Sequence, residues 1–224
     1  MFGPLYDDKH RFFGISSNSK KPNKIYQKGL REKLLCEDCE QQLSRYESYA
    51  RDVFFGETLS RPARSRVGFV FSGVLYKPLK LFLMSLLWRF SITKLEHYRG
   101  IDLGPHQESL RELISQDDPG DWLLFPCMIT GLLFERKHIA NFVIPPMRTR
   151  FEAQRVWVFA IAGFLFHSFV SNRPPPDRIR GAFLQHDGTF HVPVADIGEI
   201  PSLQFWMKQM AAAEKTRSAN RTTY

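Results

Sequence analysis

Cysteine is scarce in this chain, which has 3 copies among 224 residues. Three thiols cannot all pair, so the sequence excludes a disulfide framework and favours a reducing compartment, for which we expect a cytoplasmic location. No secretory signal is predicted, because the first twelve residues contain no apolar core and carry acidic residues where a signal would be basic. The most apolar runs, 79–90 and 156–170, are shorter than the roughly 20 residues of a membrane-spanning helix, so we expect no membrane partner.

Acidic residues are too few to balance the basic ones: 23 Asp and Glu stand against 31 Lys and Arg, which gives a net charge of +8. This balance favours polyanionic partners, such as nucleic acid or an anionic membrane surface. The sequence has no internal repeat and no glycine-rich phosphate loop, and its seven histidines form no HxH or HxxxH pair. Its 43% hydrophobic residues, among them 20 phenylalanines, predict a globular chain with an aromatic core.

Much of the positive charge lies in residues 9–33, where eight basic residues and one acid, Glu32, give a net charge of +7. Serines, asparagines, a proline and a glycine in the same stretch predict loops with at most short strands. We expect this segment to face phosphate groups, and the alternative is a solvated surface without a ligand. The nucleic-acid-binding residues predicted here are Lys20, Lys21, Lys24, Lys28, Arg31 and Lys33.

Three helices are predicted further along the chain. The first runs for about sixteen residues and ends before Gly56, with Asp38 as its N-cap. The second covers 79–92, with Pro78 in its first turn, and it is apolar on nearly every face, so it should be central and buried. The third is a short amphipathic helix over 105–116.

The remaining chain predicts mainly strands, because β-branched and aromatic residues are frequent in it. The longest apolar segment is expected to bend at Gly163, and Asp187-Gly188 predicts a hairpin turn. The predicted strand segments are 122–129, 139–144, 156–170 and the hairpin 181–194.

A last helix is predicted from Pro201, followed by a polar, frayed tail over 217–224. Together these elements predict an α+β fold. We expect a small basic knuckle-and-helix module over 1–60 and a larger domain over 67–216, which combines a buried helix with an antiparallel sheet.

Cys36 and Cys39 form a CxxC pair, whose two thiolates can face one zinc ion at about 2.3 Å. A structural zinc site needs four ligands, and the third cysteine, Cys127, stands alone in an apolar segment that predicts a buried thiol. A thioredoxin-like redox role needs a surrounding βαβ pattern, which this sequence lacks. We therefore expect Cys36 and Cys39 to hold zinc weakly or not at all in this chain.

The sequence around these cysteines, LLCEDCEQQLSRYESYA at 34–50, resembles the second zinc knuckle of an uncharacterised bacterial family of HNH-nuclease-like proteins. The similarity continues in LMSLLWR at 83–89, which resembles the central helix of the family, and in LGP at 103–105, which resembles the entry to its next helix. The resemblance covers most of the chain and implies a nucleic-acid-binding protein with a zinc knuckle.

In HNH chemistry a histidine activates water while a divalent metal such as Mg²⁺ holds the scissile phosphate. The family pattern begins with its own CxxC and a Ser-His-x-x-Pro segment, and Met1 aligns just after both. We therefore expect an incomplete ligand set and a chain that is nearly inactive on DNA or RNA. If cleavage occurs, His10 is the candidate base and Glu40 or Glu47 the candidate metal contact.

Several polar residues also have a structural interpretation. Glu40, Ser44 and Glu47 share one helix face, which favours a polar face against the knuckle over a metal site. Arg89 in an apolar helix requires a carboxylate or carbonyl partner, so we predict an ion pair. His167 in an aromatic strand is typical of a hydrogen-bonded core histidine.

Three interpretations stay open. The first is an HNH-like nucleic-acid-binding protein with an incomplete zinc knuckle, for which we expect DNA over RNA. The second is a non-enzymatic interaction protein of a bacterial defence or mobile-element cassette, which binds a partner protein through its β-rich domain. The third is a metal-independent globular protein whose basic surface only keeps it in solution.

Reversing the charges of Lys20, Lys21, Lys24 and Lys28 together tests the basic segment. We expect weaker nucleic-acid binding and a flatter dependence of log K on log salt concentration, because each neutralised phosphate releases a counterion. Fluorescence anisotropy with a labelled DNA over a series of salt concentrations measures both effects. Equal binding by the parent and the variant at every salt concentration would assign the segment to the solvated surface.

Overall fold

A computed structural model describes residues 11–14, 24–27, 32–56, 62–95, 98, 100–134, 136–138, 140, 142–200 and 203. These residues form an α+β fold, as the sequence predicts. The α-helices are α1 (Glu37–Phe55), α2 (Tyr76–Ile92) and α3 (His106–Ser115). The strands are β1 (Arg11–Gly14), β2 (Lys24–Gln27), β3 (Ala63–Arg64), β4 (Gly68–Phe71), β5 (Cys127–Phe134), β6 (Lys137–His138), β7 (Phe142–Phe151), β8 (Gln154–Ile161), β9 (Phe164–Phe169) and β10 (Phe190–Asp196).

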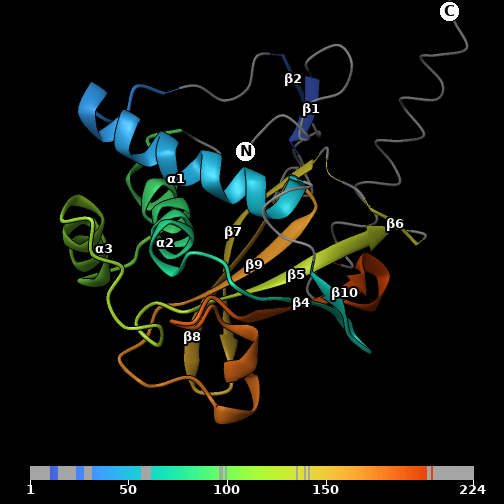
Figure 1. Cartoon of the computed structure of the whole chain (residues 1–224). Helices are drawn as coiled ribbons and strands as arrows, with labels where there is room; N and C mark the ends of the chain where they lie inside the picture. The colour runs from blue at the N-terminus through green and yellow to red at the C-terminus, as the bar shows by residue number, and fades with distance from the viewer. Residues whose placement is uncertain are drawn as a thin grey trace, which may run out of the picture.

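The strands pair into one mixed sheet in the order β2-β1-β7-β8-β9-β5-β10-β4-β3, and β6 pairs with β5 outside this path. Two of the pairs are parallel, β1 with β7 and β10 with β5, and the others are antiparallel. Two short 3₁₀ helices, η3 (Asp177–Ala182) and η4 (Ile197–Glu199), flank β10. The three α-helices lie together on one face of the sheet, with α1 across α2 (Figure 1).

Helix α2 is central and buried, as its uniformly apolar sequence predicts. Every residue from Leu79 to Trp88 is buried, so no side of these turns faces solvent. Helix α1 is amphipathic and covers α2 with a single stripe, formed by Leu43, Tyr46, Ala50 and Val53. None of the helices in the described part of the chain is long and apolar enough to cross a membrane.

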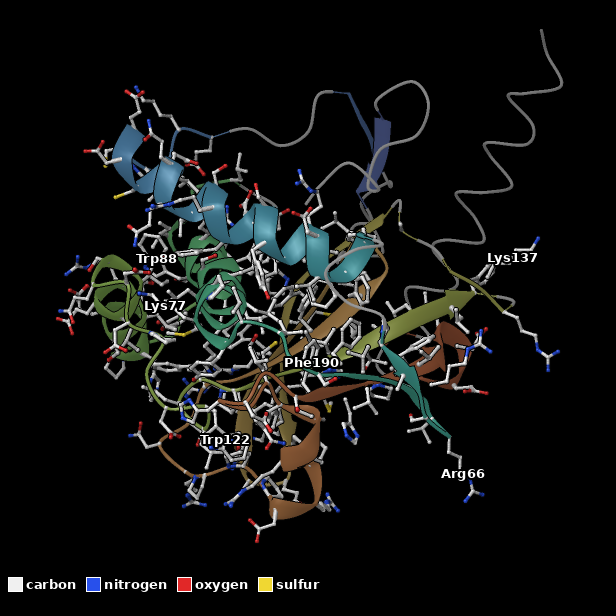
Figure 2. All side chains as sticks on the ribbon, viewed as in Figure 1. Arg66, Lys77, Trp88, Trp122, Lys137 and Phe190 are labelled. Atoms are coloured by element: carbon white, nitrogen blue, oxygen red, sulfur yellow. The ribbon has the colours of Figure 1, made fainter. Side chains whose placement is uncertain are left out.

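From Val156 to Ile161, strand β8 is buried on both sides, which explains the continuous apolar sequence of this part. Trp157, Phe159 and Ile161 pack toward the helices, while Val156 and Val158 pack toward a second core. The rings of Phe71 and Phe190 stack 4.8 Å apart within the helix-side core. Phe190 and Trp88 lie inside the molecule, whereas Arg66 and Lys137 extend away from it (Figure 2).

The predicted helices are close to the observed ones, and one cap differs. Helix α1 ends at Phe55, immediately before Gly56, as expected. Its N-cap is Cys36, and Asp38 lies inside the first turn, where its negative charge still faces the positive end of the helix. Pro78 lies in the first turn of α2, as expected.

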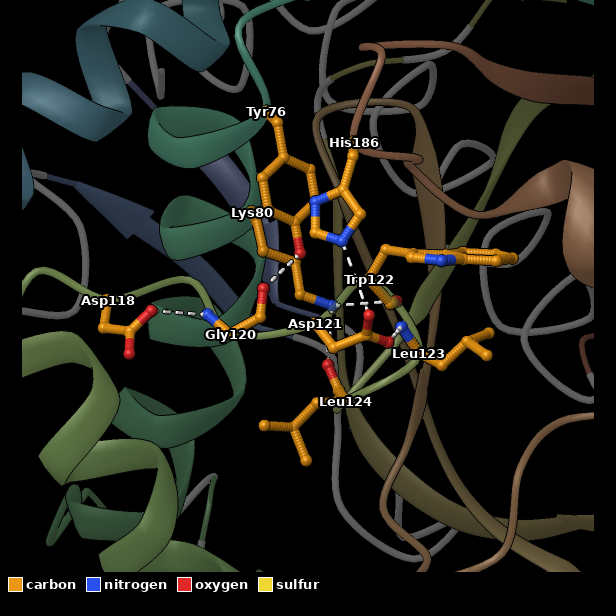
Figure 3. Close-up of polar contacts among 9 residues, drawn as sticks. All are labelled: Tyr76, Lys80, Asp118, Gly120, Asp121, Trp122, Leu123, Leu124 and His186. Carbon is orange, nitrogen blue, oxygen red and sulfur yellow. Dashed lines mark hydrogen bonds and ion pairs between the residues drawn. The ribbon is translucent and has the colours of Figure 1, made fainter.

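The strand predicted over 122–129 is wrong in its first half, because 122–126 form a loop and β5 begins at Cys127. The loop is held by Lys80 of α2, whose side chain is 2% exposed. The ammonium Nζ of Lys80 donates hydrogen bonds to the carbonyls of Trp122 (3.3 Å), Leu124 (2.6 Å) and Phe125 (3.2 Å). These carbonyls converge on a cation instead of joining a strand ladder. Figure 3 shows two of them, those of Trp122 and Leu124, with the Lys80 ammonium.

The segment 156–170 is a hairpin of β8 and β9 and not one bent strand. Ala162 and Gly163, with φ of 53° and 84°, form its two-residue turn. Positive φ at both turn positions matches the right-handed twist of the flanking strands. A bend was expected at Gly163, but the following residues pair back on β8, from Phe164 opposite Ile161 onward.

The strand predicted over 139–144 begins later and runs further, from Phe142 to Phe151. Its register with β8 shifts between Ile144 and Met147, around Pro145 and Pro146, which form a bulge. Prolines argue against a strand interior because they donate no ladder hydrogen bond, and the bulge accommodates them here.

A tight turn at Asp187-Gly188 is present, with the Gly188 amide donating to the Gln185 carbonyl at 2.9 Å. Only the arm after this turn, β10, is a strand. The helix predicted from Pro201 and the tail over 217–224 lie outside the described residues, apart from position 203.

The predicted boundary between 1–60 and 67–216 falls between elements that are packed together. Helix α1 shares a hydrophobic core with α2, and β1 pairs with β7. The first 60 residues therefore contribute both a helix to the helix layer and strands to the sheet.

Replacing Lys80 with Met tests the carbonyl cage. Burial lowers the pKa of Lys80 to about 8, so the side chain keeps its proton at neutral pH and can donate three hydrogen bonds. We expect Lys80→Met to lower the free energy of unfolding by about 3 kcal/mol, because buried acceptors without a partner cost about 1–3 kcal/mol each. Lys77→Met is the matched control, since Lys77 is half exposed and pairs with Asp117 at 2.6 Å.

Urea unfolding followed by circular dichroism measures both variants. The control should lose at most about 1 kcal/mol, as expected for an exposed ion pair. Equal losses in the two variants would contradict a structural role for the carbonyl cage.

Candidate anion-binding groove

A cleft of about 730 Å³ opens on the helix side of the sheet, beyond the end of the helix layer. Its volume is within the range of small-ligand sites, about 300–1,000 Å³. We name it the arginine groove, after the four arginines that line it. Its lining residues are Pro105, His106, Arg148, Thr149, Arg150, Ala153, Arg155, Val170, Ser171, Asn172 and Arg173.

The register of β7 and β8 places three of these arginines on one face. Arg150 lies directly opposite Arg155, and Arg148 lies opposite Trp157. Residues two apart in a strand and cross-strand partners share a face, so these side chains project from the same side of the sheet. Trp157 belongs to the helix-side core, which identifies that side as the one that the helices cover.

Helix α3 forms a wall of the groove through Pro105 and His106, at its N-terminal end. The amide groups at this end of a helix favour negative charge, which adds to the field of the arginines. The pKa of His106 is lowered, first by burial and then by the nearby Arg155 guanidinium. Its imidazole is therefore mostly neutral at physiological pH.

The four arginines of the groove form no ion pair with any acidic residue in the described part of the chain. The carboxylate of Glu152, in the turn between β7 and β8, pairs instead with Arg178 at 2.5 Å. Like charges directly opposite in a sheet are destabilising, and Arg150 and Arg155 are such a pair. An anionic ligand would offset this repulsion, so the groove has the chemistry of a phosphate or carboxylate site.

A second, smaller pocket of about 340 Å³ adjoins the groove and shares Arg148 with it. It is lined by Gly100, Ile101, Asp102, Pro146, Arg148 and Trp157. One carboxylate oxygen of Asp102, Oδ1, accepts a hydrogen bond from the Gly104 amide at 2.7 Å. The indole Nε1 of Trp157 is buried and has no hydrogen-bond partner among the described residues.

The predicted metal ligands lie elsewhere, at the start of α1. Cys36 and Cys39 are both exposed, and neither is part of a disulfide. The backbone amide and then the thiol of Cys39 lower the pKa of Cys36, while the hydrogen bond to Cys36 raises the pKa of Cys39. Within the described ranges no group of three or more His, Cys, Asp or Glu side chains is arranged to hold a metal. If zinc binds here, the two thiols can supply two of its four ligands.

Glu47, the predicted metal contact, is engaged by an ion pair with Arg89 at 2.5 Å, where both side chains are about one-fifth exposed. This confirms the ion pair predicted for Arg89. Glu47 lies eight residues after Cys39 in the same helix, which is about 12 Å along the axis. It is therefore too far away to complete a metal site with the cysteines.

Four of the six predicted nucleic-acid-binding residues lie outside the described residues, namely Lys20, Lys21, Lys28 and Arg31, and so does the candidate base His10.

Two of the predicted residues are in described segments. Lys24 is the first residue of β2, and Lys33 is exposed just before the CxxC pair. Strand β2 pairs with β1, which joins β7 at Phe142. Arg148 is six residues further along β7, so the basic N-terminal strands and the arginine groove are separated by about 20 Å of strand.

His167 in β9 is half-buried, and desolvation of its ring lowers its pKa to about 4, so the imidazole is neutral. Its Nδ1 atom has no hydrogen-bond partner among the described residues, which differs from the hydrogen-bonded histidine that we expected. Cys127 is buried, as predicted, and burial raises the pKa of its thiol to about 11. Neither residue lines the arginine groove or the adjoining pocket.

A polar cluster beside the carbonyl cage is another arrangement of titratable groups (Figure 3). His186 Nε2 lies 3.4 Å from Asp121 Oδ2, and its ring packs against Tyr76 with 4.6 Å between centroids. Tyr76 donates a hydrogen bond to the Gly120 carbonyl at 2.8 Å. His186 and Asp121 are each more than half exposed, and their contact joins two surface turns.

The groove arginines are not among the predicted site residues, because no element was predicted between the strands over 139–144 and 156–170. The signal was present: Arg148-Thr149-Arg150 has the alternation of a strand, and Arg155 follows after a short turn. Recognising it required accepting that a strand continues through Pro145-Pro146.

No protein-family model matches this chain, and the searches of curated proteins and of solved structures found no match.

The zinc content of the chain can be measured directly. We expect less than one zinc ion per chain after purification without chelator, because two thiolates leave two coordination positions to other ligands. Elemental analysis by mass spectrometry decides this, with a Cys36→Ser/Cys39→Ser variant as the control. Stoichiometric zinc that disappears in the double variant would overturn the expectation.

Proposed function

We propose that this protein binds nucleic acid and holds the phosphate backbone in the arginine groove. The observation that supports the proposal is the set of four guanidinium groups without a carboxylate partner among the described residues. Arginine suits this role because its planar guanidinium can form two parallel hydrogen bonds to one phosphate. The net charge of +8 provides the long-range attraction that brings a polyanion to the surface.

The basic segment over 9–33 is proposed as a second contact with the same strand of nucleic acid. Its strands β1 and β2 adjoin the start of β7, and the arginine groove adjoins the end of β7. A backbone that follows β7 would meet positive charge at both ends, about 20 Å apart. Binding of this kind is independent of sequence and depends steeply on salt.

The proposal includes binding and no cleavage step. HNH-type hydrolysis needs a divalent metal that carboxylate or imidazole ligands hold at the scissile phosphate. The lining of the arginine groove contains one imidazole, His106, and no carboxylate. The resemblance to HNH-like proteins still favours nucleic acid as the ligand, with DNA preferred over RNA. The three free thiols fit a reducing, cytoplasmic environment.

Substituting Arg150 and Arg155 with Gln together tests the proposal. We expect the dissociation constant for a duplex DNA of mixed sequence to rise about tenfold or more, and the slope of log K against log salt concentration to fall by about 2. Relieving the repulsion between two opposed arginines should leave the thermal stability unchanged or raise it, so lost binding would not reflect unfolding.

The control is the double variant Arg51→Gln/Arg111→Gln, which removes the same charge from exposed arginines that pair with Asp52 and Glu108. Anisotropy titrations at several salt concentrations compare the parent with both variants. An equal loss of affinity in the two variants would show that binding depends on the net charge alone and not on the groove. Unchanged binding in the groove variant would contradict the proposed site and favour a protein partner.

A further inference from the structure

One wall of the arginine groove belongs to no helix or strand. Residues 170–173, which follow β9, form this wall and include the fourth arginine of the groove, Arg173. The ladder between β8 and β9 extends as far as Val170, whose amide donates to the Arg155 carbonyl at 3.0 Å. Beyond Val170 the chain leaves the sheet, so an interaction outside the ladder must fix the position of Arg173.

The residues around Arg173 have few backbone donors with which to make such an interaction. Residues 174–176 are three consecutive prolines, which have no N–H group. The Arg173 amide is engaged locally, because it donates to the Ser171 hydroxyl at 3.2 Å. The carbonyl groups of this segment can still hold it in place, but they require a donor from another part of the chain.

Gln154, the first residue of β8, is that donor. Its side-chain Nε2 donates to the carbonyls of Arg173, at 3.3 Å, and of Pro174. Gln154 is 5% exposed, and its Oε1 atom is buried without a hydrogen-bond partner among the described residues. An apolar residue of the same size would avoid the cost of burying this oxygen, so what the amide contributes here is its donor.

Gln154 lies on the face of the sheet opposite the groove and does not line it. Arg155 projects toward the helix side, so the alternation of a strand turns its neighbour Gln154 toward the second core. Phe151, the cross-strand partner of Gln154, packs against that second core. The segment 170–174 therefore passes around the end of β8, with Arg173 lining the groove and the backbone carbonyls held from the other face.

We propose that Gln154 is a positioning residue of the arginine groove, whose buried amide holds the segment 170–174 so that Arg173 contacts a phosphate in the groove. This inference rests on the proposed function, and it adds how the binding site is assembled. The other three arginines lie on β7 and β8, whose pairing does not depend on this amide. Loss of the amide should therefore remove the contact of Arg173 and leave the others in place.

The variant Gln154→Met tests the proposal, because methionine has a similar size and no donor. We expect the dissociation constant for a mixed-sequence duplex DNA to rise about fivefold, and the slope of log K against log salt concentration to fall by about 1. Both changes follow from the loss of one phosphate contact. Arg173→Gln removes the same contact directly and should give the same two changes.

The double variant Gln154→Met/Arg173→Gln shows whether Gln154 acts through Arg173. If it does, the double variant should bind as tightly as Arg173→Gln alone, because the contact can be lost only once. Two independent contributions would instead multiply, to a rise of about 25-fold in the dissociation constant.

Gln42→Met is the matched control. Gln42 is also a half-buried to buried type of side-chain donor, since its Nε2 donates to the Ile114 carbonyl at 3.0 Å, but neither residue lines the groove. We expect both methionine variants to lose thermal stability and only Gln154→Met to change the salt slope. If Gln154→Met does not fold, Gln154→Asn takes its place: it keeps a buried amide, but its side chain is one methylene too short to reach the carbonyls, so the same fall in slope is expected.

Anisotropy titrations of the parent and each variant over a series of salt concentrations complete the experiment. A fall in slope that is specific to the Gln154 variant and is not increased in the double variant supports the inference. An unchanged slope in a folded Gln154 variant, or independent losses in the double variant, overturns the inference and leaves the proposed function standing. Absence of binding by the parent at low salt overturns the proposed function and this inference with it.

Discussion

The rest of the structure depends on the need to bury α2 on every side. Its turns from Leu79 to Trp88 have no polar face, so three other parts of the chain must cover it: α1, α3 and the helix-side surface of the sheet. Burying the apolar surface of such a helix contributes about 25 cal/mol per Å². Lys80 is the charged residue within this buried stretch, and its ammonium is stabilised by the carbonyls of the 122–125 loop. The same cation thus fixes the path by which the chain enters β5.

The arginine groove is a consequence of how far this helix layer extends. Strands β7 and β8 run on beyond it to Phe151 and Gln154, so the last residues on their helix side are not covered. An uncovered strand face is normally solvated, and polar residues there are expected. What distinguishes this surface is that its charges have one sign, and that the carboxylate of Glu152, in the turn between β7 and β8, pairs with Arg178 outside the groove. Such a concentration of arginines without a carboxylate partner among the described residues reduces stability, which is the cost that the proposed anion site would carry.

The sequence predicted some of the candidate site residues and not others. The CxxC pair is evident from its spacing, and the structure adds that both cysteines are exposed at the start of α1. Glu47 shares a helix face with Glu40, but only packing could show that Arg89, from another helix, occupies its carboxylate. The groove arginines were missed because Pro145-Pro146 is a strong local signal against a strand. Pairing with β8 on both sides of the bulge outweighs that signal.

The sequence by itself determined the α+β class, the three helices, the buried position of α2 and the excess of positive charge. Each of these follows from local patterns, such as hydrophobic periodicity and composition, that do not depend on distant contacts. Only the tertiary structure decided the order of the strands, the loop around Lys80 and the meeting of Arg148, Arg150 and Arg155 with the N-terminal end of α3. These features depend on cross-strand register and on long-range packing, because a shift of one residue would turn every arginine to the opposite face.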